Sequence, residues 1–348
     1  MMKRRISSHD VARHAGVSQS TVSLVLSGRA GTRISSETRQ RVLDAAQNLN
    51  YTINVAARAL VTGRTNRLAV VPIHPGGLLD RDMYYGQVLN GITLGALHAN
   101  HNLLLHSANY PDWQTLQGDI LNGSSDGALL IGRKHDDPLT QALLDAGFPT
   151  VCISYYTQHP SCIAVDCDNV DGGRMAVQHL LDCGYKRLAF FAPSGVETWV
   201  EARRKGAEEA LQSAGLDPNA MLLLGQEYAE QNDGWIERLI ACLRAASPSP
   251  TGIFCAEESQ ARILVEALGE YGFRVPEDMA VVSFNSTEMS ARARPPITSV
   301  RQPLVEIGKE AVRLLHAVIA GEETAPGVRR LPVSLDVRES TCAPASSP

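Results

Sequence analysis

The sequence has few of the features that mark exported, membrane-spanning or disulfide-stabilised proteins. Seven cysteines are scattered over 348 residues without a C-x-x-C pair, which argues against both a disulfide framework and a structural zinc site. No apolar run approaches the ~18 residues that cross a membrane, and the basic start MMKRRISSHD is not followed by an apolar stretch. We therefore expect reduced thiols, a cytoplasmic location and no membrane partner.

Motifs for cofactors and catalysis are also scarce. The first expected strand is not followed by G-x-G-x-x-G, and neither G-x-x-x-x-G-K-[ST] nor H-E-x-x-H occurs. His98, His101 and His106 are close in sequence, but we expect the first two on a helix and the third in a strand, which favours surface or loop histidines over a metal site. Glu257 and Glu258 are adjacent at a strand end, so they point in different directions. The sequence therefore predicts no enzyme, no cofactor and no metal.

Charge is distributed unevenly along the chain. Residues 1–67 contain eleven Lys or Arg and three acidic residues, a net charge of +8, while the whole chain carries −5, which leaves −13 for the remainder. A basic block on an acidic body indicates a polyanionic partner for the block alone, because a wholly basic surface would bind nucleic acid indiscriminately. A solvated basic arm without a partner is the alternative.

The basic block begins with the pattern of two short helices around a glycine. Ser7 is placed to cap a first helix over residues 8–15, with Asp10 three positions on. One face of that helix is apolar and small, and Gly16 suits the turn because glycine adopts positive φ at little cost. Ser18 is placed to cap a second helix.

The second helix is expected to turn Val22, Val25 and Leu26 inward and to present Gln19, Ser20 and Ser23 near its start. In a helix-turn-helix, these first residues enter the major groove, where hydroxyls and amides bond base edges. Duplex DNA is therefore the expected partner. Two packed helices with an ordinary polar face would explain the apolar spacing but not the basic charge.

A third helix and a hinge are expected to complete the block. The third helix would be capped by Ser35 or Ser36 and would face inward with the stripe Val42, Leu43, Ala46 and Leu49. Residues 51–64, YTINVAARALVTGR, would form a short helix capped by Asn54, too short to be stable alone and suited to folding on its partner. Leu60 would pack against a twin helix or wedge between base pairs of the minor groove.

From Arg67 onward, short apolar runs alternate with helical stretches. The runs RLAVVPI, NLLLHSA, GALLIG, TVCIS, RLAFFA, GIFCA and MAVVSF predict buried parallel strands, and the intervening helices are expected at 87–99, 171–183, 200–214 and 258–271. This pattern predicts a doubly wound α/β body long enough for two similar halves.

Motifs along nearly the whole chain, about residues 6 to 342, resemble those of the lactose and galactose repressor (LacI/GalR) family. They are DVARHAGVSQSTVS, YTINVAARAL, VDCDNVDGG (165–173), HLLDCGYKRLAF (179–190), GFRVPEDMAVVSF (272–284), PPITSVRQP (295–303) and VRES (337–340). The resemblance implies an all-α helix-turn-helix headpiece and a periplasmic-binding-protein-like α/β body of two doubly wound subdomains with a ligand cleft between them. The expected boundaries are 1–50 for the headpiece, 51–66 for the hinge and 67–342 for the effector-binding and dimerisation body.

The resemblance also implies roles in DNA binding. Gln19 and Ser20 would read bases, Ser18, Thr21 and Ser23 would contact phosphates, and Leu60 falls at the intercalating leucine. Leu24 departs from the family, since many relatives have a basic or polar residue there, so one specific hydrogen bond is expected to be missing. The full expected DNA-binding set is Ser7, Ser18, Gln19, Ser20, Thr21, Ser23, Leu24, Tyr51, Asn54, Arg58 and Leu60.

An effector site is expected in the body. Arg203, in R-x-x-G spacing with Gly206, is placed where the family holds effector oxygens, with a solvated helix charge as the alternative. Ring positions match at Tyr84, Tyr85 and Tyr155, which would otherwise serve lobe packing.

The lips of the expected cleft depart from the family. Relatives usually have an Asn-Asp pair after the strand that matches GIFCA and an Asp after the strand that matches MAVVSF. This sequence has Glu257-Glu258 at the first place and Asn285-Ser286 at the second, so Glu257 and Asn285 complete the expected effector set. Hydroxyl-rich ligands remain compatible with these residues, and the changed carboxylate position also favours a cationic or amino-bearing ligand. If the body binds no ligand, the substitutions are neutral sequence drift.

These features predict a homodimeric, ligand-responsive transcriptional repressor that binds a pseudo-palindromic double-stranded operator, with a sugar-like or related small polar effector. The competing class is a sugar-binding transport component or receptor without a DNA-binding role. The body favours it, whereas the headpiece and the lack of a signal peptide oppose it.

Overall fold

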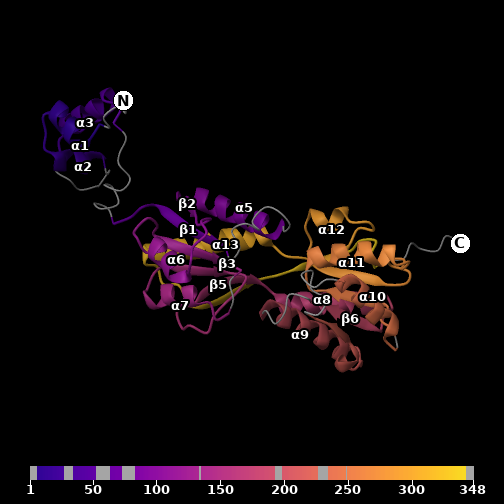
Figure 1. Cartoon of the computed structure of the whole chain (residues 1–348). Helices are drawn as coiled ribbons and strands as arrows, with labels where there is room; N and C mark the ends of the chain where they lie inside the picture. The colour runs from indigo at the N-terminus through magenta and orange to yellow at the C-terminus, as the bar shows by residue number, and fades with distance from the viewer. Residues whose placement is uncertain are drawn as a thin grey trace. The chain divides into compact units, whose positions relative to one another are not determined.

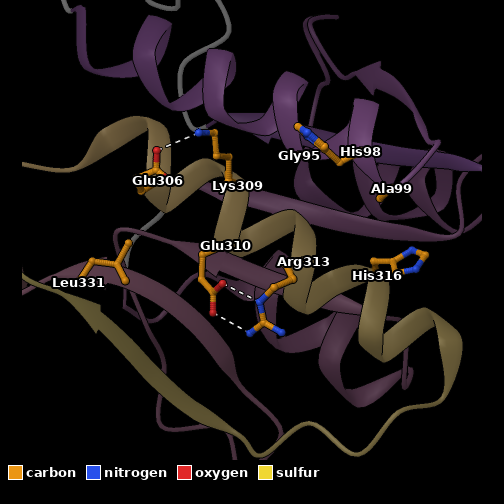
Figure 2. Close-up of a pocket in the computed structure, with 9 residues that line it drawn as sticks. All are labelled: Gly95, His98, Ala99, Glu306, Lys309, Glu310, Arg313, His316 and Leu331. Atoms are coloured by element: carbon orange, nitrogen blue, oxygen red, sulfur yellow. Dashed lines mark hydrogen bonds and ion pairs between the residues drawn. The ribbon is translucent and has the colours of Figure 1, made fainter.

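The computed structural model of the chain describes residues 6–26, 34–51, 63–72, 83–132, 135–192, 198–225, 234–247 and 249–341. Two compact units are present. One comprises the chain up to Arg67 together with Leu121–Asp126, and the other comprises Leu68–Ile120 and the chain from Gly127 onward. The helical part of the first unit is called the headpiece below, and the second unit is called the body (Figure 1).

Three helices form the headpiece: α1 (Ser8–Ala15), α2 (Gln19–Leu26) and α3 (Ser36–Asn48). The expected capping of α1 is confirmed, because Ser7 Oγ accepts from Asp10 N at 3.3 Å and the Asp10 carboxylate accepts from Ser7 N at 3.0 Å. Gly16 ends the helix at φ +62°. The three helices enclose a small core of Val11, Ala12, Ala15, Val22, Val25, Val42, Ala45 and Ala46.

The inward face of α3 differs in part from the expected apolar stripe. Ser35 is the cap, since its hydroxyl accepts from Thr38 N at 3.2 Å. Val42 is buried as expected, but Leu43 is 42% exposed and Ala45 takes the inward position. Adjacent helical residues point about 100° apart, so Leu43 is directed away from the face that Val42 occupies.

The first lobe of the body contains a six-stranded sheet in the order β11-β5-β4-β3-β1-β2. The pairs β1–β3, β3–β4, β4–β5 and β5–β11 are parallel. Helices α5 and α13 cover one face, and α6 and α7 cover the other. The elements are β1 (Arg67–Pro72), α5 (Met83–His98), β2 (Asn102–Leu105), α6 (Trp113–Ile120), β3 (Gly127–Ile131), α7 (Pro138–Asp145), β4 (Thr150–Ile153), β5 (Ile163–Cys167), α13 (Leu304–Ala320) and β11 (Gly327–Leu331).

The second lobe contains another six-stranded sheet, in the order β12-β10-β9-β8-β6-β7, in which only the β10–β12 pair is antiparallel among the pairs described. Helices α8 and α9 pack on one face, and α10 and α11 pack on the other. The elements are α8 (Asn169–Asp182), β6 (Leu188–Phe191), α9 (Thr198–Ser213), the 3₁₀ helix η2 (Pro218–Ala220), β7 (Leu222–Leu224), α10 (Trp235–Ala245), β8 (Gly252–Cys255), α11 (Glu258–Glu270), β9 (Ala280–Asn285), α12 (Glu288–Arg292), β10 (Thr298–Arg301) and β12 (Ser334–Asp336).

The chain passes between the lobes at three points. It leaves the first lobe after β5, returns after β10 to form α13 and β11, and leaves again to form β12 (Figure 1). Residues at the carboxyl ends of strands therefore meet close to these passages, as in other open α/β sheets.

Two glycines allow α8 and α9 to lie very close together. A Cβ added to Gly173 would lie 1.9 Å from the carbonyl oxygen of Arg203, and one added to Gly206 would lie 1.9 Å from that of Val170. Gly206 therefore brings the backbone of α9, and with it Arg203, against the start of α8.

Several expectations for the body need correction. β2 is a partly exposed edge strand rather than a buried one. His101 lies beyond the end of α5, with Nε2 3.0 Å from His316 Nδ1, and His106 follows β2 instead of lying within it.

Among the helices of the described ranges, none is both long and apolar enough to span a bilayer.

Candidate functional site

The start of α2 carries a connected set of polar side chains on the headpiece surface. Ser18 Oγ accepts from Thr21 N at 3.1 Å and lies 2.7 Å from Ser20 Oγ and 2.8 Å from Thr21 Oγ1. Gln19 and Ser20 are exposed. The structure thus brings these four residues together at one helix N-terminus, where amide N–H groups and the helix dipole favour an anion.

Gln19 has a partner that the sequence did not indicate. Its Nε2 donates to Ser8 Oγ at 2.9 Å, so the first turn of α1 orients the amide. The two residues are eleven positions apart, and only the crossing of α1 and α2 brings them together.

The remaining expected DNA-binding residues have different positions. Ser23 and Leu24 are partly exposed on α2, whereas Ser7 uses its hydroxyl in the capping box. Tyr51 packs against the headpiece core, with its N–H bonded to Ala46 O at 2.8 Å. The other three expected residues lie outside the described ranges: Asn54, Arg58 and Leu60.

In the body, Arg203 is the centre of a buried polar cluster. Its side chain is on α9, is only 5% exposed, and donates from Nε to Asn169 Oδ1 at 2.9 Å and from Nη1 to Ala256 O. The guanidinium carbon lies 3.5 Å from the centre of the Phe284 ring and 4.6 Å from that of Trp199. Burial lowers the pKa of Arg203, and these hydrogen bonds and ring faces compensate for the lost hydration. The solvated-charge alternative is therefore wrong for this residue.

Asn169 connects Arg203 to a buried carboxylate. Its Nδ2 donates to Asp166 Oδ2 at 2.9 Å, while Asp166 Oδ1 accepts from Cys167 N at 2.8 Å. Burial raises the pKa of Asp166 to about 6, against the lowering effects of the Cys167 N–H and of Arg203. Asp166 and Asn169 lie within the VDCDNVDGG motif, but the sequence did not assign them a role at the site. Their position at the passage from β5 to α8 was the available indication.

The two adjacent glutamates have different environments. Glu257 is the partly exposed residue before α11, and its charge favours the charged form of Arg203. Glu258 is 2% exposed and accepts from Thr287 N and Oγ1 at 2.7 Å and from Ser290 N at 3.0 Å. Glu258 therefore fastens the start of α12 to α11, whereas Glu257 is the more exposed of the two glutamates.

Asn285 ends β9 in an unusual backbone conformation. Its φ is +104°, its side chain is 5% exposed, and its Oδ1 accepts from Gln302 Nε2 at 2.6 Å. The hydrogen bond from Gln302 therefore fixes the orientation of the Asn285 amide at the end of β9.

The three expected tyrosines do not form one cluster. Tyr84 donates a hydrogen bond to Ser154 Oγ, which follows β4, and its ring makes an edge contact with Tyr85 at 5.3 Å between centres. Tyr155 is 2% exposed, belongs to the core beneath α7, and has its hydroxyl 2.7 Å from Thr140 Oγ1. Tyr155 therefore packs the first lobe.

The described part of the chain holds no cluster of three or more His, Cys, Asp or Glu side chains suited to a metal ion. A G-x-S-x-G spacing is present at residues 123–127, but it connects the end of α6 to β3. A nucleophile elbow runs from strand to helix, so this segment has the wrong order.

A helix-turn-helix headpiece and a two-lobed α/β body in one chain define a DNA-binding transcriptional regulator with a receptor body. Comparison with known families agrees: "Bacterial regulatory proteins, lacI family" matches residues 8–54, and "Periplasmic binding protein-like domain" matches residues 177–341.

The chain is 34% identical over 346 residues to the HTH-type transcriptional regulator CelR of Thermobifida fusca, covering 97% of this chain and 99% of CelR. A solved CelR–cellobiose complex matches with a TM-score of 0.71 at 31% identity, covering 97% of this chain and 100% of that one. The lac repressor dimer bound to operator and the anti-inducer ONPF matches with a TM-score of 0.79 at 23% identity, covering 98% and 100%, which supports the fold.

The chain belongs to the lacI family of bacterial regulatory proteins. It is a transcriptional regulator rather than an enzyme, as its named relatives are.

Proposed function

We propose that this chain is a cytoplasmic repressor that binds a pseudo-palindromic operator as a homodimer. The observation that carries the proposal is the exposed group of Gln19, Ser18 and Ser20 at the N-terminus of α2 in a block with a net charge of +8. A twofold pair of headpieces would place two such helices in successive major grooves. The solved lac repressor is a dimer on its operator, which supports the same assembly here.

Roles follow for the individual headpiece residues. Gln19 and Ser20 read base edges, and Ser18, Thr21 and Ser23 hold phosphates. Leu24 adds an apolar contact, and Ser7 maintains α1. The hinge is assigned the remaining roles: Tyr51 and Asn54 support it, Arg58 adds a cation, and Leu60 wedges into the minor groove.

An operator titration tests this proposal. Fluorescence anisotropy with a family-type palindrome should show tight binding that weakens steeply with salt. Gln19→Ala should weaken binding about tenfold, because one base contact contributes on the order of 1–3 kcal/mol. Gln47→Ala, on the exposed side of α3, is the matched control and should not change binding. Leu60→Ala should weaken operator binding without changing effector affinity. No rise in anisotropy with any palindrome at low salt would contradict the proposal.

For the effector, we propose a neutral, hydroxyl-rich saccharide held beside Arg203. The guanidinium has five N–H donors, more than its contacts with Asn169, Ala256 and Cys167 use. Glu257 supplies an acceptor and Asn285 supplies an amide donor. The rings of Tyr84 and Tyr85 offer apolar faces that suit the apolar side of a sugar ring. The cellobiose bound to CelR supports this ligand class.

A thermal-shift screen tests the effector assignment. Cellobiose, maltose, glucosamine and a nucleoside are compared at equal concentration, since a ligand at 100 times its Kd adds ~2.7 kcal/mol of stability. Arg203→Lys should abolish the shift, because it removes the planar fork of donors. Arg204→Lys, next to it on α9 and paired with Glu208 at 3.4 Å, is the control. A thermal shift with glucosamine alone would show that the effector is a cationic sugar rather than a neutral one.

We also propose functional boundaries of 1–50 for the headpiece, 51–66 for the hinge and 67–342 for the body. Limited proteolysis should cut first within 51–66 in the absence of DNA and should spare that segment on the operator.

A further inference from the structure

Two cysteines of the first lobe are in side-chain contact. Cys152 lies in β4 and is fully buried, and Cys162 directly precedes β5 and is 5% exposed. Their sulfur atoms are 4.0 Å apart. β4 and β5 are parallel neighbours with Cys152 opposite Ala164, so both thiols are on the same face of the sheet, beneath α7.

The short distance makes a covalent bond accessible. A disulfide needs an S–S distance of about 2.0 Å and Cα atoms usually about 4.4–6.8 Å apart. Because Cys162 is two positions from the residue opposite Cys152, closing the 4.0 Å between the sulfurs requires side-chain rotation together with a shift of the segment before β5. Hydrogen bonds keep the two segments beside each other: Ser154 N donates to Val165 O at 2.9 Å, and Gly327 N donates to Cys162 O at 2.8 Å.

The two thiols are chemically unequal. The pKa of Cys162 is lowered to about 6, first by the hydrogen bond with Cys152 and then by the Thr157 N–H and the charges of His159 and His135, against the opposing effect of burial. A thiolate is the nucleophilic form of cysteine, so Cys162 is the attacking residue.

The pKa of Cys152 is raised by its hydrogen bond with Cys162 and by burial, with Asp137 also raising it. Only the hydrogen bond with Tyr155 lowers it. Cys152 therefore stays protonated while Cys162 reacts with an oxidant, and it must release its proton before it can attack the Cys162 sulfur.

We propose that Cys152 and Cys162 form a reversible disulfide, so that the first lobe contains a redox modification site whose oxidant is a hydroperoxide. The Cys162 thiolate attacks the peroxide; an S–O bond forms, the O–O bond breaks, and hydroxide leaves to give a sulfenic acid. Cys152 then attacks the Cys162 sulfur; the S–S bond forms, the S–O bond breaks, and the thiol proton departs with the hydroxyl as water. Each disulfide consumes one hydroperoxide, and a dithiol reductant restores both thiols.

The site lies next to a residue that contacts the candidate effector region. Cys152 is two positions before Ser154, which accepts the hydrogen bond of Tyr84, and residues 153–161 connect the two cysteines. A disulfide would close this connection into a covalent loop. Disulfide formation itself does not depend on the proposed operator or effector.

Peroxide treatment of the full chain tests the proposal. After oxidation with hydrogen peroxide, alkylation of the remaining thiols and proteolysis, mass spectrometry should find the Cys152 and Cys162 peptides linked, lighter by two hydrogen atoms than the sum of the free peptides. Alkylation should then label five of the seven cysteines, and dithiothreitol should restore labelling of all seven. Cys255→Ser, at an equally buried strand position in the second lobe, is the matched control and should leave the linkage intact.

Two further variants keep the test decisive. Cys162→Ser should abolish the linkage. Cys152→Ser should stop the reaction at the Cys162 sulfenic acid, which dimedone traps, so this variant gives a readout even if Cys162→Ser does not fold. The absence of the linked peptide in folded wild-type protein would overturn the proposal, as would oxidation confined to the exposed Cys183.

Discussion

Arg203 Nε and Asn169 Oδ1 are 2.9 Å apart, and this hydrogen bond joins the second turn of α9 to the first residue of α8. The same asparagine donates to Asp166, the last residue but one of β5. A single amide therefore connects a cation of the second lobe to a carboxylate of the first lobe's sheet.

Asn169→Ala should destabilise the body by about 2 kcal/mol, because it leaves a buried guanidinium N–H and a buried carboxylate oxygen without their partner. The free energy of unfolding from denaturant titration measures the loss. Asn219→Ala, on the exposed η2, should cost much less. Equal losses in the two variants would show that the connection has no special energetic role.

Gly206→Ala should destabilise the body by about 1–3 kcal/mol, because the new methyl group would meet the Val170 carbonyl and force α8 and α9 apart. Gly118→Ala is the matched control within α6, where an added Cβ meets nothing within 4 Å. That control should stabilise by about 0.5–1 kcal/mol through the helix preference of alanine. Thermal unfolding of both variants measures the difference, and a harmless Gly206→Ala would contradict the close packing.

Ser7→Ala should lower headpiece stability by about 1 kcal/mol, because it removes the hydroxyl from the capping box with Asp10. Ser7→Asn should retain most of the stability, since asparagine is also a good cap. Circular dichroism of the full chain in denaturant, combined with operator titration, measures both effects. If the two variants bind the operator equally weakly despite different stabilities, Ser7 contacts DNA directly as well.

The raised pKa of Asp166 gives a pH dependence of opposite sign to that of a paired surface carboxylate. Between its ordinary pKa of 3.8 and its folded value of about 6, the folded chain holds a proton that the unfolded chain has released. The contribution of Asp166 to stability is therefore fully present below pH 3.8 and is lost as pH rises through about 6. Asp166→Asn should remove this slope from the unfolding free energy measured against pH. Asp182→Asn, exposed at the end of α8, should leave it unchanged.

Local patterns predicted the headpiece well. The cap at Ser7, the glycine turn and the inward Val22 and Val25 depend on neighbours within a few positions, and the structure confirms each of them. Leu43 was misplaced because a one-residue error in helical phase separates the inward face from the outward face.

The body was predicted less completely. Seven apolar strands, among them the fully buried β3 and β9, were expected from the sequence, but β5, β7, β10, β11 and β12 were not, although β5 is also fully buried. The sequence of β11, GVRRL, is largely exposed at a sheet edge and lacks the apolar run that marked the inner strands. The cluster of Asp166, Asn169 and Arg203 depends on contacts up to 34 positions apart, which only the assembled fold reveals.

The order of elements along the chain has a consequence for biosynthesis. β11 completes the first lobe's sheet beside β5, and α13 packs with Val88 and Ile92 of α5 on one face of that sheet, yet both elements follow α8 to β10 of the second lobe in the chain. Domains generally fold from the N-terminal end as they are translated. The first lobe's sheet therefore lacks its edge strand and one covering helix until most of the second lobe has been translated, and the nascent polypeptide exposes that apolar surface during this interval.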